Sequence, residues 1–214
     1  MIRSTEFDEF YNSLPANVQN KVKYAMNILA DVKVVNTKLV KKLVDTDFYE
    51  LRISVGNEYR VILFTIDHEN FIEAEQILLL NGFMKKSTKD YKKEIQKADT
   101  KSRTNFKQFT AMRPKIDINK LKHLPSTEDM FVDEYGAKGT ASRDEFDAKS
   151  RAWYYAEVLK NARKSAGITQ QQLADKIGKK REYVAMLEKG ETDMQLSTFI
   201  MISEAVGLKF ALTY

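Results

Sequence analysis

The sequence contains no cysteine, only two histidines and no apolar run near the roughly 20 residues that a membrane-spanning helix needs. The absence of cysteine excludes disulfides and thiolate chemistry. His68 and His123 lie far apart with no ligand pattern around them, so we expect neither a metal site nor a cofactor. The N-terminal stretch has acidic residues where a signal peptide needs its apolar segment, so we expect no membrane association and a cytoplasmic location.

Length and composition leave room for more than one domain. At 214 residues the chain can form one large domain or two small ones. A hydrophobic fraction of 43% beside a charged fraction of 30% is typical of a soluble protein with a packed core. The net charge of +5 is compatible with nucleic-acid binding but is too small to indicate it alone.

Hydrophobic periodicity divides the first hundred residues into helical and strand-like parts. Apolar residues at helical spacing predict a helix over residues 4–14 and a second helix after Pro15. The pattern then changes to alternation, which predicts three strands at residues 48–55, 59–66 and 71–80. A charged helix over residues 88–101 follows. This order predicts an α+β domain with an antiparallel meander.

Two stretches of this domain carry a family resemblance: DFYELRISVGNEYRVIL at 47–63 and LLLNGFMKKSTKDYKKEIQKA at 78–98. Together they resemble the RelE, HigB and ParE superfamily of bacterial toxins, and the Gly-Phe-x-Lys-Lys element favours the HigB branch. Asn81 stands where these toxins commonly have histidine. The resemblance covers residues 1–100 and implies a RelE-like fold of two helices, a meander and a C-terminal helix.

The resemblance also implies an mRNA endoribonuclease that works without a metal, with the ribosome as partner. In such cleavage the ribose 2′-OH attacks the adjacent phosphate, so the site must move protons and stabilise charge on phosphorus. Arg60 stands where these toxins clamp the phosphate, and Arg52 offers a second guanidinium. Lys85 matches a basic residue near the scissile phosphate, and Tyr91 matches a tyrosine that transfers protons or stacks on a base. The candidate catalytic residues are therefore Arg60, Lys85, Tyr91, Arg52 and Lys86, and the candidate RNA-binding residues are Lys89, Lys92 and Lys93.

Several of these residues also have a simpler interpretation. Arg60 could pair with Glu50 or Glu73 within the sheet, and Tyr91 could pack the last helix onto it. Lys92 and Lys93 could belong to a solvated helix face. No histidine is present at the site, so it lacks a side chain whose unperturbed pKa lies near neutrality. Two alternatives therefore stay open: a gyrase-directed toxin, as in the ParE branch, and a catalytically inactive domain that serves oligomerisation or corepression.

The middle of the chain is acidic and weakly periodic. Proline, glycine and serine scattered over residues 104–150 predict a loosely structured connection with short helical turns. Residues 126–150 hold seven acidic side chains against three basic ones, whereas residues 83–101 hold seven lysines against three acidic side chains. We therefore expect part of 112–150 to fold against the first domain and restrain it, the alternative being a solvated linker. From Met112 onward the sequence resembles the start of a HigA-type antitoxin.

Residues 167–190, GITQQQLADKIGKKREYVAMLEKG, predict two short helices joined by a tight turn. Thr169 can cap the first helix, Gly178 follows its last apolar residue, and Gly190 ends the second helix. The alternative is a helical hairpin that binds no DNA. The residues resemble the Xre/Cro-type repressor family, which implies a five-helix domain that binds operator DNA as a homodimer. The apolar pattern predicts two helices after Gly190, and a short strand at 208–214.

The family pattern assigns DNA contacts to this motif. Gln170 would meet a phosphate, and Arg181 is the best candidate for reading guanine. The candidate DNA-binding residues are Gln170, Lys179, Lys180, Arg181, Glu182, Tyr183 and Met186.

The sequence thus predicts three parts with separate functions. They are a RelE/HigB-like toxin domain at 1–103, an acidic linker or antitoxin N-terminal segment at 104–150, and an all-α Xre-type domain at 151–214. The whole is interpreted as a toxin–antitoxin fusion: an mRNA endoribonuclease neutralised by an antitoxin that also represses transcription. The expected partners are mRNA, the ribosome, double-stranded operator DNA and a second copy of the chain.

Overall fold

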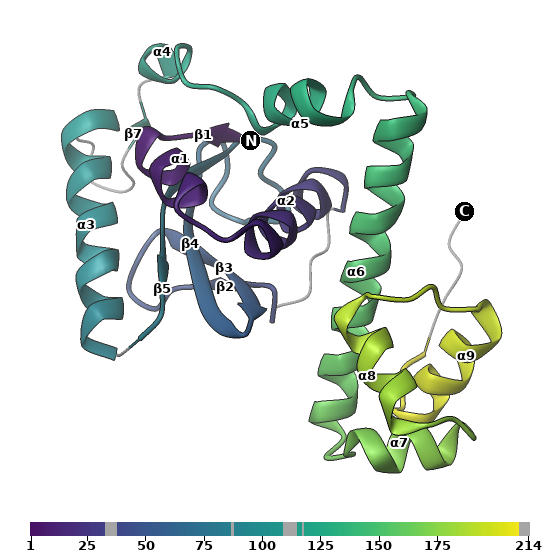
Figure 1. Cartoon of the computed structure of the whole chain (residues 1–214). Helices are drawn as coiled ribbons and strands as arrows, with labels where there is room; N and C mark the ends of the chain where they lie inside the picture. Colours follow the sequence, from purple (N-terminus) through teal and green to yellow (C-terminus); the bar gives the residue numbers. More distant parts are fainter. Residues whose placement is uncertain (33–37, 87, 109–114, 117, 210–214) are drawn as a thin grey trace. The chain divides into compact units, whose positions relative to one another are not determined.

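The computed structural model describes the chain except for residues 33–37, 87, 109–114, 117 and 210–214 (Figure 1). The chain forms two compact units, Met1–Phe146 and Asp147–Tyr214. The boundary lies within helix α6, Ala141–Ser165, which contributes residues to both units. None of the described helices is both long and apolar enough to cross a membrane.

A five-stranded sheet forms the centre of the first unit, in the order β1-β5-β4-β3-β2. Strand β1 pairs parallel with β5, and the other neighbours are antiparallel. The predicted meander is therefore present, with one added strand at each edge, β1 and β2, which are too short to show a sequence period. The strands are β1 Ile2–Arg3, β2 Val40–Lys42, β3 Phe48–Val55, β4 Asn57–Thr65 and β5 Ile77–Met84.

The third strand of the meander begins later than its apolar pattern predicted. Residues 71–76 belong to the turn after β4, so the predicted strand at 71–80 is displaced to Ile77–Met84. The cause is Asp67, whose carboxylate accepts hydrogen bonds from the backbone N–H groups of Glu75 and Gln76 at 2.9 and 3.1 Å. These two bonds span eight and nine residues, close the loop at its base and delay the start of the strand.

Helices cover both faces of the sheet (Figure 1). They are α1 Thr5–Asn12, α2 Ala16–Asp31 and α3 Thr88–Phe106. A Cβ atom on Gly82 of β5 would lie 2.1 Å from the ring of Phe10 in α1. The next residue, Phe83, packs its ring 5.9 Å from that of Tyr91 in α3. Because successive strand residues face opposite sides, α1 and α3 lie on opposite faces.

Residues 104–150 contain more regular structure than the expected loose connection with short helical turns. It contains the short strands β6 Lys107–Gln108 and β7 Lys115–Ile116, and the helices α4 Ile118–Leu121, α5 Thr127–Tyr135 and the start of α6. Helix α5 begins with a capping box, in which Ser126 and Asp129 exchange side-chain and backbone hydrogen bonds. The acidic composition of this stretch hid its helices from the sequence analysis, because the acidic side chains lie on helices that also have buried apolar residues.

Residues 125–146, named here the docking segment, are part of the first unit. The backbone N–H of Arg3 donates to Pro125 O at 2.9 Å, and that of Thr127 donates to Met1 O at 3.1 Å. Ser126 also forms an antiparallel bridge with Ile2. The docking segment is therefore bonded through its main chain to the edge strand β1.

Side chains then fix the docking segment in place. Arg143 is 1% exposed, forks onto Glu128 at 2.9 and 3.0 Å, and lies over the ring of Phe131. Glu134 pairs with the buried Lys23 of α2. The expected folding of this region onto the first domain is thus observed. Its anchoring lysine, however, lies outside the lysine-rich 83–101 stretch whose charge suggested the contact.

The second unit is helical throughout its described secondary structure. After α6 come α7 Gln170–Lys176, α8 Arg181–Lys189 and α9 Leu196–Ala205, so the described residues form four helices where five were expected. One helix follows Gly190 instead of two, because Met194 packs on the core from a non-helical loop. The predicted strand at 208–214 lies mostly outside the described residues. The buried core consists of Leu159, Leu173, Ala174, Ile177, Val184, Leu187 and Ile202.

Candidate nucleic-acid interfaces

Charged side chains of β3 and β4 lie in three cross-strand rows on the sheet face that α3 covers. Residues opposite each other in neighbouring antiparallel strands point to the same face, and so do residues two apart in one strand. The rows are Glu50–Ile62–Asn81, Arg52–Arg60–Phe83 and Ser54–Glu58. Lys85 follows directly after β5 and extends the third row, because its backbone N–H donates to Glu58 O at 2.7 Å.

The buried carboxylate of Glu50 brings three of the predicted site residues together. Glu50 is 1% exposed. It accepts a hydrogen bond from the Tyr91 hydroxyl at 2.7 Å and another from Arg52 Nε at 2.6 Å. Arg60 Nε lies 3.6 Å from the same carboxylate, which is an ion pair. The simpler interpretation of Arg60, pairing with Glu50, is therefore observed, and it places Arg60 in the same cluster as Arg52 and Tyr91.

The other end of the Arg60 guanidinium points to groups on its own strand. One terminal nitrogen donates to the backbone oxygen of Tyr59 at 2.8 Å. The other donates to the carboxylate of Glu58 at 2.9 Å. Arg60 Nε is buried and makes no hydrogen bond within the structure. The side chain of Glu58 is 51% exposed, in contrast to that of Glu50.

Two groups of the cluster have shifted pKa values. Burial raises the pKa of the Tyr91 hydroxyl, and the hydrogen bond to Glu50 and the charge of that carboxylate raise it further. Tyr91 thus keeps its proton at neutral pH, donates it in a hydrogen bond to Glu50, and is a weaker acid than an ordinary phenol. For Glu58 burial acts to raise the pKa, but hydrogen bonds from Ser54 and Arg60 and the charges of Arg60 and Lys85 outweigh it. The net effect is a lowered pKa, so Glu58 carries a negative charge at neutral pH.

The predicted lysines lie around this cluster at the surface. Lys85 is exposed, and its Nζ lies 5.4 Å from the centre of the Tyr91 ring. Lys86, Lys92 and Lys93 are also exposed. The side chain of Lys89 is not among those that the structure describes. In the described part of the chain no group of three acidic or histidine side chains is arranged to hold a metal ion.

Sequence reasoning named Glu50 only as a possible partner of Arg60, and it missed Glu58 and Ser54 as members of this cluster. Strand alternation carried the necessary signal, because Glu50, Arg52 and Ser54 are two residues apart in one strand. The register that brings Glu58 opposite Ser54 follows from the tight turn at Gly56, whose φ is 69°.

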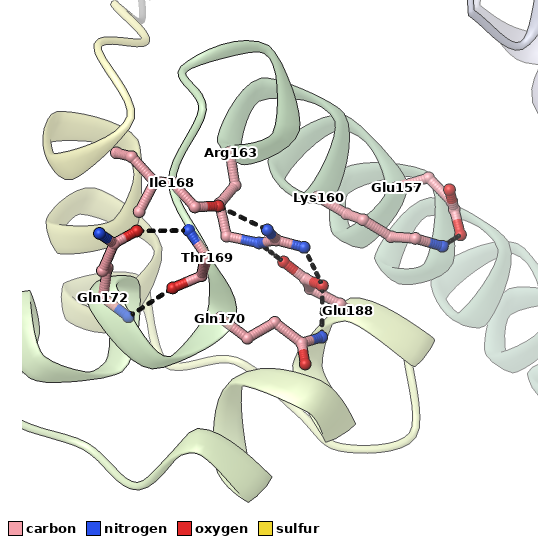
Figure 2. Close-up of polar contacts among 8 residues, drawn as sticks. All are labelled: Glu157, Lys160, Arg163, Ile168, Thr169, Gln170, Gln172 and Glu188. Atoms are coloured by element: carbon pink, nitrogen blue, oxygen red, sulfur yellow. Dashed lines mark hydrogen bonds and ion pairs between the residues drawn. The ribbon is translucent and has the colours of Figure 1, made fainter.

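The second interface is the predicted helix–turn–helix, and its first helix starts as the sequence indicated. The Thr169 hydroxyl accepts from Gln172 N at 3.1 Å, and Gln172 Oε1 accepts from Thr169 N at 2.8 Å (Figure 2). Gly178 and Gly190 have φ values of 63° and 67°, a left-handed backbone that ends each helix at little cost.

A buried ion pair holds the motif together. Arg163 of α6 donates two hydrogen bonds to the carboxylate of Glu188 of α8, one from Nε and one from a terminal nitrogen at 2.9 Å. Its other terminal nitrogen donates to Ile168 O at 2.6 Å. Gln170 of α7 donates its amide to the same carboxylate at 2.8 Å (Figure 2). Gln170 was expected to bind a phosphate. In the structure one of its amide hydrogens is engaged by Glu188.

Most of the remaining DNA-binding candidates lie on the exposed side of the motif. Lys179, Lys180, Arg181 and Glu182 are exposed, and Met186 is 44% exposed. Tyr183 is half-buried, packs against the core, and lies 5.8 Å from Lys179 Nζ. Its role is therefore partly in packing, whereas the first turn of α8 carries exposed charged side chains.

Comparison with known families gives one match to the N-terminal part of the chain and another to the C-terminal part. A family model described as "Phage derived protein Gp49-like", a toxin family, matches residues 9–103. A "Helix-turn-helix" family model, of the Xre type, matches residues 159–212. A search of curated proteins gave no match. The chain therefore joins a Gp49-like toxin-family domain to a helix–turn–helix DNA-binding domain, the combination expected of a toxin–antitoxin fusion.

Proposed function

We propose that the N-terminal domain is an mRNA endoribonuclease of the HigB type, active on the ribosome. The rest of the chain would restrain it, and the C-terminal domain would repress transcription from operator DNA as a homodimer. One observation carries the nuclease proposal: Arg52, Arg60, Lys85 and Tyr91 converge at one end of one sheet face. Cations and a protonated phenol gathered in this way suit a phosphate diester.

The chemistry follows from what each group can supply. The guanidinium groups of Arg60 and Arg52 offer planar forks to phosphate oxygens, and Lys85 adds a third positive charge. Tyr91 keeps its proton, and it would donate to the leaving 5′-oxygen once its hydroxyl turns away from Glu50. The strongest contribution in this cluster is therefore stabilisation of charge on phosphorus, and proton removal from the 2′-OH is its weakest.

The docking segment supports restraint within the chain. It is hydrogen-bonded to Met1 and Arg3, and it buries Phe131, Arg143 and Phe146 in the first unit. Truncation after residue 103 would remove these contacts, whereas truncation after Phe146 would keep them. The antitoxin half thus contributes an integral part of the nuclease-side unit, separate from its helix–turn–helix.

The proposal is tested by expressing residues 1–111, residues 1–146 and the full chain. For each we would measure growth arrest and mRNA cleavage on ribosomes. We expect cleavage from 1–111, and its loss in Arg60→Ala. Lys42→Ala, which removes an exposed cation of β2 on the opposite face of the sheet, serves as the control and should change nothing. Cleavage that Arg60→Ala leaves intact would contradict the assigned site, and arrest with altered DNA supercoiling but intact mRNA would indicate a gyrase-directed toxin.

A second candidate function is a DNA-binding regulator with an inactive N-terminal domain. The observation that favours it is the engagement of Arg60 by Glu50, Tyr59 and Glu58. This candidate predicts folded 1–111 and 1–146 fragments without cleavage, together with operator binding by the full chain that Arg181→Ala weakens by about 1–3 kcal/mol.

A further inference from the structure

The carboxylate of Glu58 lies among the donors that the proposed function assigns to an RNA phosphate. It accepts from Arg60 at 2.9 Å and from the Ser54 hydroxyl at 2.6 Å. Lys85 is near enough for its charge to help lower the pKa of Glu58. An acidic group at this place is unexpected for a site that binds a polyanion, because it repels the ligand and occupies its donors.

The two glutamates of the cluster differ in burial. The side chain of Glu50 is 1% exposed, whereas that of Glu58 is 51% exposed. Glu50 therefore cannot leave without uncovering two guanidinium groups that share it. Glu58 can rotate into solvent, where water replaces the hydrogen bonds of its half-exposed carboxylate. Arg60, whose side chain is 8% exposed, then keeps its ion pair with Glu50 and its hydrogen bond to Tyr59 O.

We propose that Glu58 occupies the place of a substrate phosphate on Arg60 while the site is free of RNA, and that it is displaced when RNA binds. Glu50 stays in place and is the positioning residue that holds Arg52, Arg60 and Tyr91. This inference rests on the proposed function, because its ligand is an RNA phosphate. It assigns opposite effects to two glutamates in neighbouring strands.

The opposite signs follow from the contacts. Replacing Glu58 with glutamine removes a charge that repels the phosphate, while the amide can still bond to Ser54 and Arg60. Replacing Glu50 with glutamine leaves two guanidinium groups without their buried counter-charge and weakens the hold on Arg52 and Arg60. The first change should strengthen RNA binding, and the second should weaken it.

The test measures binding of a short single-stranded RNA by fluorescence anisotropy to the full chain carrying Arg181→Ala, which weakens binding by the helix–turn–helix. The RNA has 2′-O-methyl riboses, so no 2′-OH is available for cleavage. We expect Glu58→Gln to bind about three- to tenfold more tightly than the parent. We expect Glu50→Gln to bind about tenfold or more weakly. Glu75→Gln removes the same charge from an exposed turn residue and should leave binding unchanged.

The outcomes separate this inference from the proposed function. If Arg60→Ala binds like the parent, the phosphate site is wrong and both proposals fall. If Arg60→Ala weakens binding but Glu58→Gln does not strengthen it, the displacement of Glu58 is wrong and the site stands. A gain in affinity requires a folded protein, so the Glu58→Gln result does not depend on the stability of the variant. Thermal unfolding of Glu50→Gln distinguishes lost positioning, in a folded protein, from lost structure.

Discussion

Each unit of the chain buries one glutamate among hydrogen-bond donors, and the two glutamates differ in their balance of charge. Glu188 is bound by a single guanidinium, that of Arg163, and by the neutral amide of Gln170. Glu50 is shared by the guanidinium groups of Arg52 and Arg60 and by the Tyr91 hydroxyl. The first cluster is neutral, and the second has more positive charge than its buried carboxylate can balance.

The difference separates a structural ion pair from the site that we propose for an RNA phosphate. A neutral, fully hydrogen-bonded pair such as Arg163–Glu188 holds α6, α7 and α8 in one arrangement and offers little charge to a ligand. A cluster with surplus positive charge is costly unless an anion completes it, and such clusters gather at functional sites. In the first unit Glu58 supplies that anion from its own strand.

Arg163→Ala is expected to have the largest effect, and it tests whether the Arg163–Glu188 pair is structural. It leaves Glu188 buried with one neutral donor, and we expect the second unit to lose about 3–5 kcal/mol of stability. Thermal unfolding of the full chain would measure the loss. The matched control is Lys160→Ala in the same helix, which breaks the more exposed pair with Glu157 (Figure 2). That change should cost about 0–1 kcal/mol, and equal losses in the two variants would refute the structural role.

Arg60→Ala is the corresponding change in the first unit. It leaves Glu50 with two of its three partners, Arg52 and Tyr91. We expect a smaller loss of stability than for Arg163→Ala, about 1–2 kcal/mol, together with the loss of cleavage. Chemical unfolding monitored by tryptophan would miss the change, because Trp153 lies in the second unit. Far-UV circular dichroism of the full chain is the suitable measurement. A loss as large as that of Arg163→Ala would show that the Glu50 cluster is mainly structural.

The smallest effect is expected at high pH. Burial raises the pKa of Tyr11 to about 12, with further contributions from Glu134 and, in the opposite sense, Arg3. A raised pKa in the folded state means that the stabilisation is complete below pH 10 and disappears as the pH rises through about 12. Stability of the first unit should therefore fall over this window, and Tyr11→Phe should make the fall shallower. Stability against pH, followed by circular dichroism, would reveal an unchanged slope if Tyr11 were solvated.

The local parts of the fold were predictable from sequence. Thr169, Gly178 and Gly190 act within one or two turns of their own helices, so their spacing was enough to predict the motif. The meander followed from alternation, which also puts Glu50 and Arg52 on one face. Short elements such as β1 could not be predicted, because two residues have no period, and their stability comes from pairing with β5.

The candidate sites were predictable only in part, because their decisive contacts join distant residues. Arg163 and Glu188 are 25 positions apart, and Tyr91 reaches Glu50 across 41 positions. The position of Glu58 opposite Ser54 depends on the register set at Gly56. The docking segment is harder still, since the bridge between Ile2 and Ser126 requires the sheet to exist before the segment has anything to pair with.

The docking segment also determines what a break in the backbone would do. While the chain is intact, the tether keeps the segment at an effective concentration of about a millimolar beside its binding surface, so even weak docking is nearly complete. A cut between α3 and α5 leaves every docking contact in place but turns the segment into a separate ligand. Occupancy then follows the concentration of the fragment in the cell, and dilution alone shifts the equilibrium toward the undocked state. Severing the chain thus converts a permanent association into a reversible one.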